Sequence, residues 1–521
     1  MLDKLEKGKL RKQLFYHLDG LAMCGVVPVL HEWSLLERVF HASGDVDQLA
    51  AEYRANSGYL NVALRMLCSQ GLLEAARAED MINYRPAVGK TPKDWYLHNS
   101  SYAAGRKWMM CIVGSWNTPG KAFAPGDLMS LEILMDAWRD MPDEGIMSRI
   151  KSHLEGALVA PFLVTLGTIH GTKPISTWED HNAAVLKMHA SKQEAWGRIL
   201  ILLGWDNTDK GAFFLKRSSA YGVTTSYVKT FIWSKELIFG NGSYLWRIKP
   251  GEPEIHVDRT LNVWGSGGAH KAYFTHLDEV IKSVFNAPLE NQPAGLCDMG
   301  CGNGALLLHL AEVIKTSTLR GQNLETHPLE LVGADFNQEA LIATADHFKQ
   351  EGVDGHFIWG DIGDPDQLAM DIWRVHKIRL GDLMSVRSFL DHNRIFNRPV
   401  IDRPDRAIST GAFAFRGERL KLRNVEQSLK EHFLRWAPYV AEHGLLVVEL
   451  HTIDPEAAAD RQGDMPATAY DATHGFADQY IVEVPVYDAM AAEAGLLIDT
   501  SCSRTFPKEL PATVSIRYFK A

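Results

Sequence analysis

A glycine-rich loop between two apolar segments constrains the fold of this chain more than any other feature. The loop reads Asp298-Met-Gly300-Cys-Gly302-Asn-Gly304; it follows a short apolar run and opens onto the apolar segment 305–314. Glycine lacks a Cβ and adopts positive φ, so such a loop lets the backbone pass close to a ligand. A helix that starts after the loop adds unpaired N–H groups. These segments predict a strand, a loop and a helix that bind an adenosine-bearing cofactor.

The segments after the loop repeat one pattern, an apolar run that ends in an acid. The run 329–335 ends at Asp335, and the run 355–361 ends at Asp361. Further apolar runs, typical of strands, cover 443–450 and 513–519. Strands that alternate with helices predict an α/β fold with a parallel sheet covered on both faces. Asp335 is then placed to accept hydrogen bonds from ribose hydroxyls.

The loop spacing differs from the dinucleotide fingerprint G-x-G-x-x-G. It resembles motif I of the class I S-adenosylmethionine (SAM) methyltransferases, and the acid-terminated strands fit that family in order. The resemblance implies a Rossmann-like core over residues 286–521. It also implies that the acid after the third strand meets the adenine amino group, with its apolar neighbour against the ring. The cofactor-binding residues implied in this core are Asp298, Gly300, Gly302, Gly304, Asp335, Phe336, Asp361 and Ile362.

Composition excludes several classes of protein. Hydrophobic residues make up 46% of the 521 residues and charged residues 23%, as in ordinary soluble proteins. The formal net charge of −10 argues against a nucleic-acid partner, because phosphates require a basic surface. The six scattered cysteines read as reduced residues of a cytoplasmic protein. The charged start lacks a signal peptide, and the apolar stretch 157–169, interrupted by Pro161, is too short to span a membrane.

Residues 1–90 resemble a winged-helix module. An acid at Asp45 precedes one helical pattern, the segment 57–71 forms a second that ends at glycine, and a hairpin begins near Leu72. Such modules read DNA in regulators and serve dimerisation or substrate coverage in several methyltransferases. The acidic balance favours the second use, and the oligomeric state stays open.

Residues 91–285 are expected to form a helical lid or connector. Helices are indicated at 128–140, 181–203 and 277–284. The glycine-rich patch 257–270 has two interpretations. It is a flexible hinge, or it is a loop that closes on the methionine end of the cofactor through Ser266 and Gly267.

Three polar spots follow expected strand ends in the core. Asp391 and His392 come after the expected fourth strand, His451 follows the fifth, and His474 and Gln479 precede the next helix. The carboxyl ends of parallel strands meet at one crevice, so these residues are expected to converge. Each histidine alone fits a structural role, a general base or a metal ligand. Two histidines with an oxygen donor suit mononuclear Fe or Mn.

The core, the patch 262–270 and the runs 388–394 and 474–480 together resemble the metal-dependent C-methyltransferases of polyketide chain initiation, in the loading modules of the apratoxin and saxitoxin pathways. The resemblance implies that His392, His451 and Gln479 hold the metal, with Asp391 beside them, and that the partner is an acyl carrier protein bearing a malonyl-type thioester. In that family a GNAT-like domain accompanies the methyltransferase. None follows in this chain, so we expect a stand-alone enzyme or an excised piece.

The sequence therefore predicts a SAM-dependent enzyme that methylates the α-carbon of a carrier-bound malonyl-type thioester with metal assistance. Its catalytic residues would be His392, His451 and Asp391. A small-molecule O-methyltransferase with a histidine base is the first alternative. A DNA-binding regulator that senses SAM is the second, and methylation of RNA or protein ranks last because the chain has no Asn-Pro-Pro-Tyr-type motif.

Overall fold

The computed structural model describes residues 2–78, 80–87, 92–246, 254–401, 403, 405–509 and 511–520. The chain forms two compact units. Unit 1 comprises residues 1–269, 412–419 and 454–478, and unit 2 comprises 270–411, 420–453 and 479–521. This division differs from the three consecutive segments expected from the sequence, because two segments from the second half of the chain pack within unit 1.

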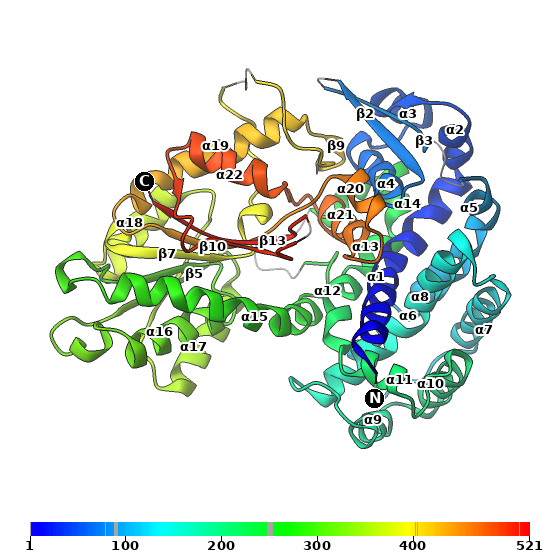
Figure 1. The fold of residues 1–521 in the computed structure, drawn as a ribbon, viewed down its shortest axis with the longest axis horizontal. Helices are drawn as coiled ribbons and strands as arrows, with labels where there is room; N and C mark the ends of the chain where they lie inside the picture. The colour runs from blue at the N-terminus through cyan, green and yellow to red at the C-terminus, as the bar shows by residue number, and fades with distance from the viewer. Residues whose placement is uncertain are drawn as a thin grey trace. The chain divides into compact units, whose positions relative to one another are not determined.

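Unit 1 is mostly helical (Figure 1). Its helices before the core are α1 (Lys4–Glu32), α2 (Leu35–His41), α3 (Val46–Tyr53), α4 (Ser57–Ser69), α5 (Pro92–His98), α6 (Tyr102–Ile112), α7 (Pro125–Asp140), α8 (Gly145–His170), α9 (Trp178–Val185), α10 (Ala190–Leu203), α11 (Asp209–Leu215), α12 (Gly222–Ser226), α13 (Val228–Ile232) and α14 (Ser234–Phe239). Later segments add β8 (Ala414–Phe415), β9 (Glu418–Arg419), α20 (Pro455–Asp460) and α21 (Ala467–Gly475).

The winged-helix-like region forms as expected. The Asp45 carboxylate accepts hydrogen bonds from the N–H groups of Asp47 and Gln48 and so caps α3. After α4, strands β2 (Leu73–Ala78) and β3 (Met81–Pro86) pair antiparallel, and β1 (Gly44–Asp45) pairs with the other edge of β3. Two helices followed by a small sheet are the elements that the sequence predicted for this region.

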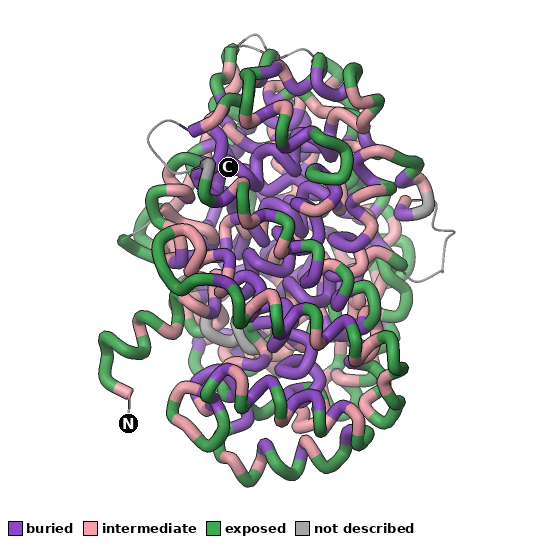
Figure 2. The backbone as a smooth tube through the Cα atoms, turned by 90° about the vertical axis from the view of Figure 1, so that its right-hand side faces the viewer, coloured by how far each residue is buried: buried purple, intermediate pink, exposed green. Residues whose placement is uncertain are grey.

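Helices α1 and α8 form the centre of unit 1. A Cβ at Gly20 would lie 2.4 Å from the Cα of His153, and one at Gly156 would lie 2.5 Å from the Cα of His17, so glycine is required where the helices cross. By length and composition alone both helices could cross a membrane, so the expectation that the stretch 157–169, which lies in α8, is too short to do so is wrong. However, 78% and 83% of their most apolar windows are buried, which is typical of core helices in a soluble protein. The exposed residues of α1 lie near its start and at its last two residues, His31 and Glu32, and most of the helix between them is buried (Figure 2).

Unit 2 is built on a sheet with the strand order β11-β13-β10-β7-β4-β5-β6, with β12 paired to β13. Its strands are β4 (Gly295–Met299), β5 (Glu330–Asp335), β6 (His356–Trp359), β7 (Leu383–Ser388), β10 (Leu445–Leu450), β11 (Leu497–Ile498), β12 (Arg504–Phe506) and β13 (Val514–Lys520). Strands β4, β5, β6, β7 and β10 run parallel, whereas β13 is antiparallel to β10. This is an α/β core with a mostly parallel sheet, as the sequence predicted.

Helices cover both faces of this sheet (Figure 1). They are α16 (Ala305–Ser317), α17 (Gln338–Glu351), α18 (Pro365–His376), α19 (Leu422–Val440) and α22 (Val484–Glu493), together with α15 (Arg259–Phe285), which begins in unit 1 and ends in unit 2. The apolar side chains of α15 and α16 pack on Leu296, Met384 and Leu446 of the central strands. The buried sheet thus fixes the strand ends where the candidate site lies.

Three local predictions are wrong. The expected helix 181–203 is two helices, because His189 is extended and its N–H donates to the Pro119 carbonyl. His474, which was expected to lie in a loop before the next helix, is part of helix α21 (Ala467–Gly475).

The third concerns the glycine-rich patch, which was expected to be a hinge or loop but is part of α15. Gly265 faces Gly222, where a Cβ would lie 2.6 Å from the Gly222 Cα. Trp264 packs on Gly167, and its Nε1–H donates to the Gly171 carbonyl at 3.0 Å. The patch therefore allows close helix packing within unit 1. The glycines alone do not reveal this role in the sequence, because glycines are equally typical of a flexible loop.

Candidate functional site

The glycine loop follows the carboxyl end of β4. Three of its glycines, at every second position, have positive φ angles. These are 74° at Gly300, 58° at Gly302 and 75° at Gly304. A Cβ at Gly304 would lie 2.7 Å from Thr344, whereas one at Gly302 would meet nothing within 4 Å. The Gly302 N–H donates to the Asp335 carboxylate at 3.0 Å. The loop is thus held to β5 while its middle remains open to a ligand.

Asp298 lies behind this loop and is 2% exposed. Its Oδ1 is buried and has no hydrogen-bond partner among the described residues. Burial, and secondarily the charge of Asp335, raises the pKa of Asp298 to about 8. A buried acid with an orphaned oxygen fits the polar tail of a cofactor that carries an ammonium group, because such a group would supply the missing donor.

The ends of β5 and β6 form the neighbouring part of the site. Asp335 also accepts from the Asn337 N–H at 2.8 Å, and Asp361 accepts from the Gly363 N–H at 2.7 Å. Phe336 is 59% exposed and contacts the Trp359 ring at 5.3 Å between centroids. The remaining predicted residue, Ile362, is buried. An acid beside an exposed aromatic ring fits the ribose and adenine of SAM.

The predicted residues Ser266 and Gly267 lie in helix α15, within the part that belongs to unit 1. Ser266 Oγ donates to the Val263 carbonyl at 3.3 Å, and a Cβ at Gly267 would meet nothing within 4 Å. Their role toward the cofactor remains a prediction.

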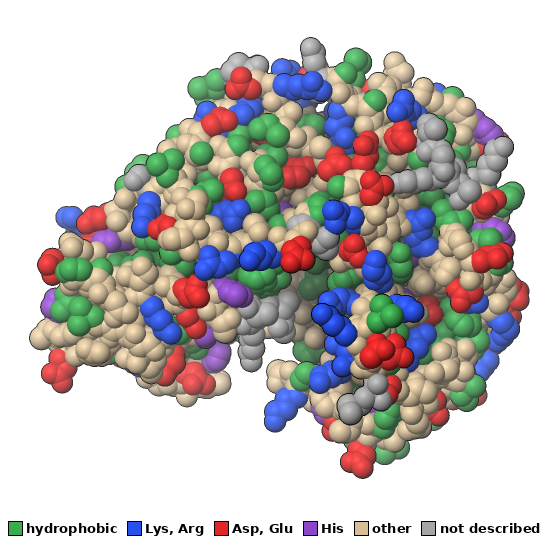
Figure 3. Space-filling model, in the orientation of Figure 1, with side chains coloured by type: hydrophobic (Ala, Val, Ile, Leu, Met, Phe, Trp, Pro, Cys, Tyr) green, Lys and Arg blue, Asp and Glu red, His purple; other side chains and the backbone are tan. Residues whose placement is uncertain are grey.

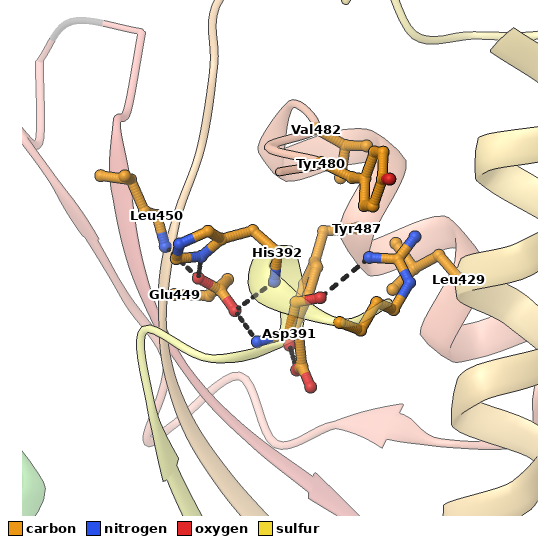
Figure 4. Close-up of a pocket in the computed structure, with 9 residues that line it drawn as sticks. Asp391, His392, Leu429, Glu449, Leu450, Tyr480, Val482 and Tyr487 are labelled. Atoms are coloured by element: carbon orange, nitrogen blue, oxygen red, sulfur yellow. Dashed lines mark hydrogen bonds and ion pairs between the residues drawn. The ribbon is translucent and has the colours of Figure 1, made fainter. Parts of the chain in front are cut away.

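A pocket lies at the carboxyl ends of β7 and β10 (Figure 4). It is lined by Asp391, His392, Arg394, Leu429, Glu449, Leu450, Tyr480, Val482 and Tyr487. Asp391 and His392 form a 3-10 turn, η8 (Asp391–Asn393), just after β7. Glu449 lies near the end of β10, the parallel neighbour of β7. The sheet therefore brings together groups that are far apart in sequence.

Glu449 and His392 form the central pair of the pocket. His392 Nδ1 lies 2.6 Å from Glu449 Oε1, and Figure 4 shows the two side chains pointing toward each other. The same carboxylate accepts from the N–H groups of Asp391 at 2.7 Å and Leu450 at 2.7 Å. Because a carboxylate oxygen accepts here, Nδ1 of His392 carries a proton.

Asp391 is fully buried beneath this pair. It accepts from Arg387 Nη1 at 2.6 Å, from His432 Nε2 at 3.1 Å and from the Tyr487 hydroxyl at 2.5 Å. Burial by itself raises the pKa of Asp391, but the Arg387 charge and these hydrogen bonds outweigh it and lower the pKa. Its carboxylate is thus saturated by donors, which suits holding the η8 turn rather than contacting a substrate.

His451 is buried immediately after β10. Its Nδ1 lies 3.1 Å from the Val482 carbonyl, and its Nε2 lies 2.7 Å from the Ser515 hydroxyl. A carbonyl only accepts, so Nδ1 is the donor and Nε2 accepts from Ser515. Burial, against the Val482 hydrogen bond, lowers the pKa of His451 to about 3. The imidazole is therefore neutral, the form that binds metals.

Gln479 joins the same unit as the two histidines. Its Nε2 donates to Asn393 Oδ1 at 2.8 Å, and the next residue, Tyr480, donates its N–H to the His392 carbonyl at 2.7 Å. The Oε1 atom of Gln479 is buried and has no hydrogen-bond partner among the described residues. The alternative donor, His474, lies in α21 of unit 1, where its Nδ1 is 2.7 Å from the Tyr470 carbonyl.

The side chains of His392, His451 and Gln479 carry the kinds of donor atom that bind a divalent cation. Both imidazoles have Nδ1 tied to an acceptor, which is the usual support for a histidine that binds metal through Nε2, and Gln479 offers an orphaned oxygen. The Ser515 hydroxyl would have to turn away from His451. Within the described ranges, no group of three or more His, Cys, Asp or Glu side chains is arranged to hold a metal. The predicted set has only two such residues and a glutamine.

Sequence reasoning missed several residues of the pocket. Glu449 is an acid near the end of an apolar run, which is the same signal that pointed to Asp335 and Asp361. It could have been predicted for that reason. Arg394 and Tyr487 gave no comparable signal. The buried Arg394 guanidinium donates to the Asp391 and Val425 carbonyls, and burial lowers its pKa.

A comparison with solved structures returns methyltransferases at low similarity. An O-methyltransferase family 2 protein from Planctomyces limnophilus, solved with apigenin, is 12% identical with a TM-score of 0.35, covering 100% of this chain and 98% of that one. Human N-acetylserotonin methyltransferase with SAM is 12% identical with a TM-score of 0.27, covering 98% and 95%. The CurJ carbon methyltransferase is 13% identical with a TM-score of 0.34, covering 76% and 97%. Scores this low carry no argument about activity.

No curated protein matches the chain. Two family models do. The model described as the AprA N-terminal domain matches residues 10–75, and the model described as the AprA MT2-like domain matches residues 254–517, more than half of the chain. The second match spans the glycine loop, the acid-terminated strands and the His392 pocket. The chain therefore belongs to the AprA MT2-like domain family and is a SAM-dependent methyltransferase.

Proposed function

We propose that this enzyme methylates the α-carbon of a malonyl-type thioester carried on an acyl carrier protein, with a divalent metal, Fe or Mn, held by His392, His451 and Gln479. The observation that carries the proposal is the arrangement of donors in unit 2. Glu449 fixes His392 at 2.6 Å, Val482 fixes His451, and Gln479 keeps a buried oxygen without a partner.

The chemistry that a bound divalent ion would supply is Lewis acidity toward a 1,3-dicarbonyl, which makes the α-proton easier to remove. Bound SAM supplies an electrophilic methyl group. The residues of the chain do the rest. Glu449 holds His392 in one tautomer, while Leu429, Leu450 and Val482 line the pocket with apolar surface that excludes water. The buried charge of Arg394 on the pocket wall suits a malonyl carboxylate.

A second function rests on the same pair. Glu449 and His392 resemble a carboxylate-oriented base, because Glu449 would stabilise the imidazolium formed when His392 Nε2 takes a proton. That arrangement suits an O-methyltransferase that needs no metal. The two functions differ in the product, a methyl group on carbon or on oxygen, and in their response to a chelator.

The test combines elemental analysis with mass spectrometry of malonyl-carrier protein after incubation with SAM. Purified wild type should hold about one Fe or Mn per chain and methylate carbon, and a strong chelator should abolish both. His392→Ala, His451→Ala and Gln479→Ala should lose metal and methyl transfer while SAM binding is retained. His474→Ala is the matched control and should keep its metal. Equal metal content in His451→Ala and wild type would defeat the proposal, and O-methylation in chelator would establish the second function.

A further inference from the structure

The proposed ligand Gln479 follows directly on a segment that folds with the other unit. The chain leaves unit 2 after Ile453, shortly past His451, and returns to unit 2 at Gln479. All residues between, 454–478, belong to unit 1 and carry α20 and α21. Two of the three residues proposed to bind metal therefore flank a segment whose own fold is fixed by packing within unit 1.

Helix α21, near the end of segment 454–478, is held closely within unit 1. A Cβ at Gly475 would lie 2.6 Å from Cγ2 of Val62 in α4, so α21 and α4 are in close contact. At the start of α21, the buried Thr468 hydroxyl accepts from Nε2 of buried Gln70 at 2.7 Å. The segment is therefore well fixed before it reaches its last residue, Asp478.

The Asp478 carboxylate is held by two donors. Its Oδ1 accepts from the Tyr59 hydroxyl of α4 at 2.9 Å, and its Oδ2 accepts from the Arg416 N–H at 2.7 Å. Arg416 lies in the turn between β8 and β9, and this turn is itself fixed because the Gly58 N–H of α4 donates to the Gly417 carbonyl at 2.8 Å. One helix thus supplies the first donor and holds the turn that supplies the second.

The backbone around Gln479 is fixed on both sides. Asp478 has a φ of 54°, a left-handed conformation that aspartate adopts more readily than most residues. After Gln479, the Tyr480 N–H donates to the His392 carbonyl at 2.7 Å. The Gln479 amide donates to Asn393 Oδ1 at 2.8 Å, which leaves Oε1 buried and without a hydrogen-bond partner among the described residues.

We propose that Asp478 is a positioning residue that orients Gln479 toward the metal, an inference that rests on the proposed function. In this role Asp478 touches neither metal nor substrate and acts through the peptide bond that joins it to Gln479. Groups that orient a metal ligand typically contribute about 10- to 100-fold to metal affinity. A glutamine side chain has many rotamers to lose, so a fixed backbone matters for its contribution as a ligand.

The test is a titration of the intact, metal-free protein with Mn²⁺, with SAM affinity measured alongside. Asp478→Gly removes both carboxylate contacts and keeps the left-handed backbone, which glycine adopts without strain. Its Kd for Mn²⁺ should rise about tenfold or more, because Gln479 loses its orientation. Its Kd for SAM should be unchanged.

Asp478→Asn is the conservative variant and should keep nearly wild-type affinity for Mn²⁺. Its amide oxygen can accept from the Arg416 N–H while its NH₂ group donates to the Tyr59 hydroxyl. Acidic and basic side chains are interspersed over the visible face of the molecule (Figure 3), and both Asp478 variants remove the same negative charge. A difference between them therefore reports the hydrogen bonds of Asp478, not a general attraction of the cation.

Two further variants separate this role from a general effect on folding. Tyr59→Phe removes one of the two anchors and should weaken Mn²⁺ binding less than Asp478→Gly does. The matched control is Tyr439→Phe, which removes another Tyr–Asp hydrogen bond, to Asp366 at 2.6 Å, and should leave Mn²⁺ affinity unchanged. Because Asp478 acts only through Gln479, adding Asp478→Gly to Gln479→Ala should weaken Mn²⁺ binding no further.

Contrary results have different consequences. Wild-type Mn²⁺ affinity of Asp478→Gly, beside a loss in Gln479→Ala, would overturn the positioning role and leave the proposed function intact. A further loss in the double variant, or an equal loss of SAM affinity, would make Asp478 a structural residue without a specific role in metal binding. A wild type that binds no Mn²⁺, or a Gln479→Ala variant that binds it as tightly as wild type, would overturn the proposed metal site and this inference together.

Discussion

Carboxylates at strand ends take on different tasks in this enzyme according to their environment. Asp335 and Asp361 are partly exposed and accept hydrogen bonds from loop N–H groups. Glu449 is buried and spends its oxygens on His392 and two backbone N–H groups. Asp298 is buried with one oxygen unpartnered. Carboxylates at strand ends therefore hold a loop, orient an imidazole or stay buried with an oxygen unpartnered.

Asp298 gives the first prediction, a pH-dependent effect on stability. Its folded pKa is about 8, above the unfolded value of about 3.9. Between these values the folded state holds a proton that the unfolded state has released, so folding stability falls as pH rises. The side chain of the Asp298→Asn variant does not titrate, so the variant does not lose folding stability for this reason as pH rises. In SAM-free protein, the unfolding free energy of the variant relative to wild type should rise by on the order of 1 kcal/mol or more from about pH 5 to about pH 9.

Urea unfolding of both proteins at several pH values measures this difference. A difference that stays constant with pH would show that the Asp298 carboxyl does not titrate in this range. SAM should narrow the difference at high pH if its ammonium group meets the orphaned Asp298 oxygen, because a bound cation favours the ionised form.

At the scale of single elements, helix α15 shows that a glycine can allow two helices to pack closely. The sequence offers Gly265, Gly267 and Gly268 as one flexible patch. In the structure Gly265 lies against Gly222 of α12, and Gly267 faces open space. Sequence alone does not separate these roles, because both positions have the same residue type and the difference lies in what packs against the helix.

The second prediction compares two alanine substitutions in α15. Gly265→Ala places a Cβ 2.6 Å from the Gly222 Cα, so it should destabilise the protein by about 1–3 kcal/mol. Gly267→Ala meets nothing within 4 Å and should stabilise the helix by about 0.5–1 kcal/mol. Thermal unfolding of the SAM-free variants measures both. Equal effects would mean that the α12 contact is not made in solution.

On the scale of the whole molecule, unit 1 is assembled from segments that are distant in sequence. Arg65 of α4 and Asp471 of α21 form a buried pair with Nε and Oδ2 at 2.9 Å. The N–H of Ala469, also in α21, donates to buried Asp19 of α1 at 2.9 Å. Segment 454–478 is thus part of the core of unit 1, which explains why the chain does not divide into consecutive domains.

The third prediction tests this link in the intact chain. Arg65→Leu or Asp471→Leu leaves a buried charge without its main partner and should cost about 3–5 kcal/mol. The double variant should cost clearly less than the sum of the single variants, because neither charge remains. Arg85→Leu is the control: Arg85 pairs with Glu74 in an exposed hairpin and should cost less than about 1 kcal/mol. Additive effects in the double variant would contradict the pairing.

The fold of the core was predicted well because its signals are local. The acids Asp335 and Asp361 end apolar runs, and glycines occupy positions 300, 302 and 304, where φ is positive. Both signals can be read directly from the sequence. The strands β5, β10 and β13 begin within two residues of the predicted runs. The helix break at 186–189 was not predicted, because it depends on a hydrogen bond from His189 to Pro119, 70 positions earlier.

The sequence by itself determined the cofactor loop, the alternation of strands and helices, and the residue types at the strand ends. These follow from backbone sterics and hydrophobic periodicity, which act within a few residues. Only the tertiary structure decided which side chains meet. Glu449 reaches His392 because β7 and β10 are parallel neighbours, with Ser388 opposite Val448. Sheet order and register set that contact, and neither is encoded in the 57 positions of chain that separate the two residues.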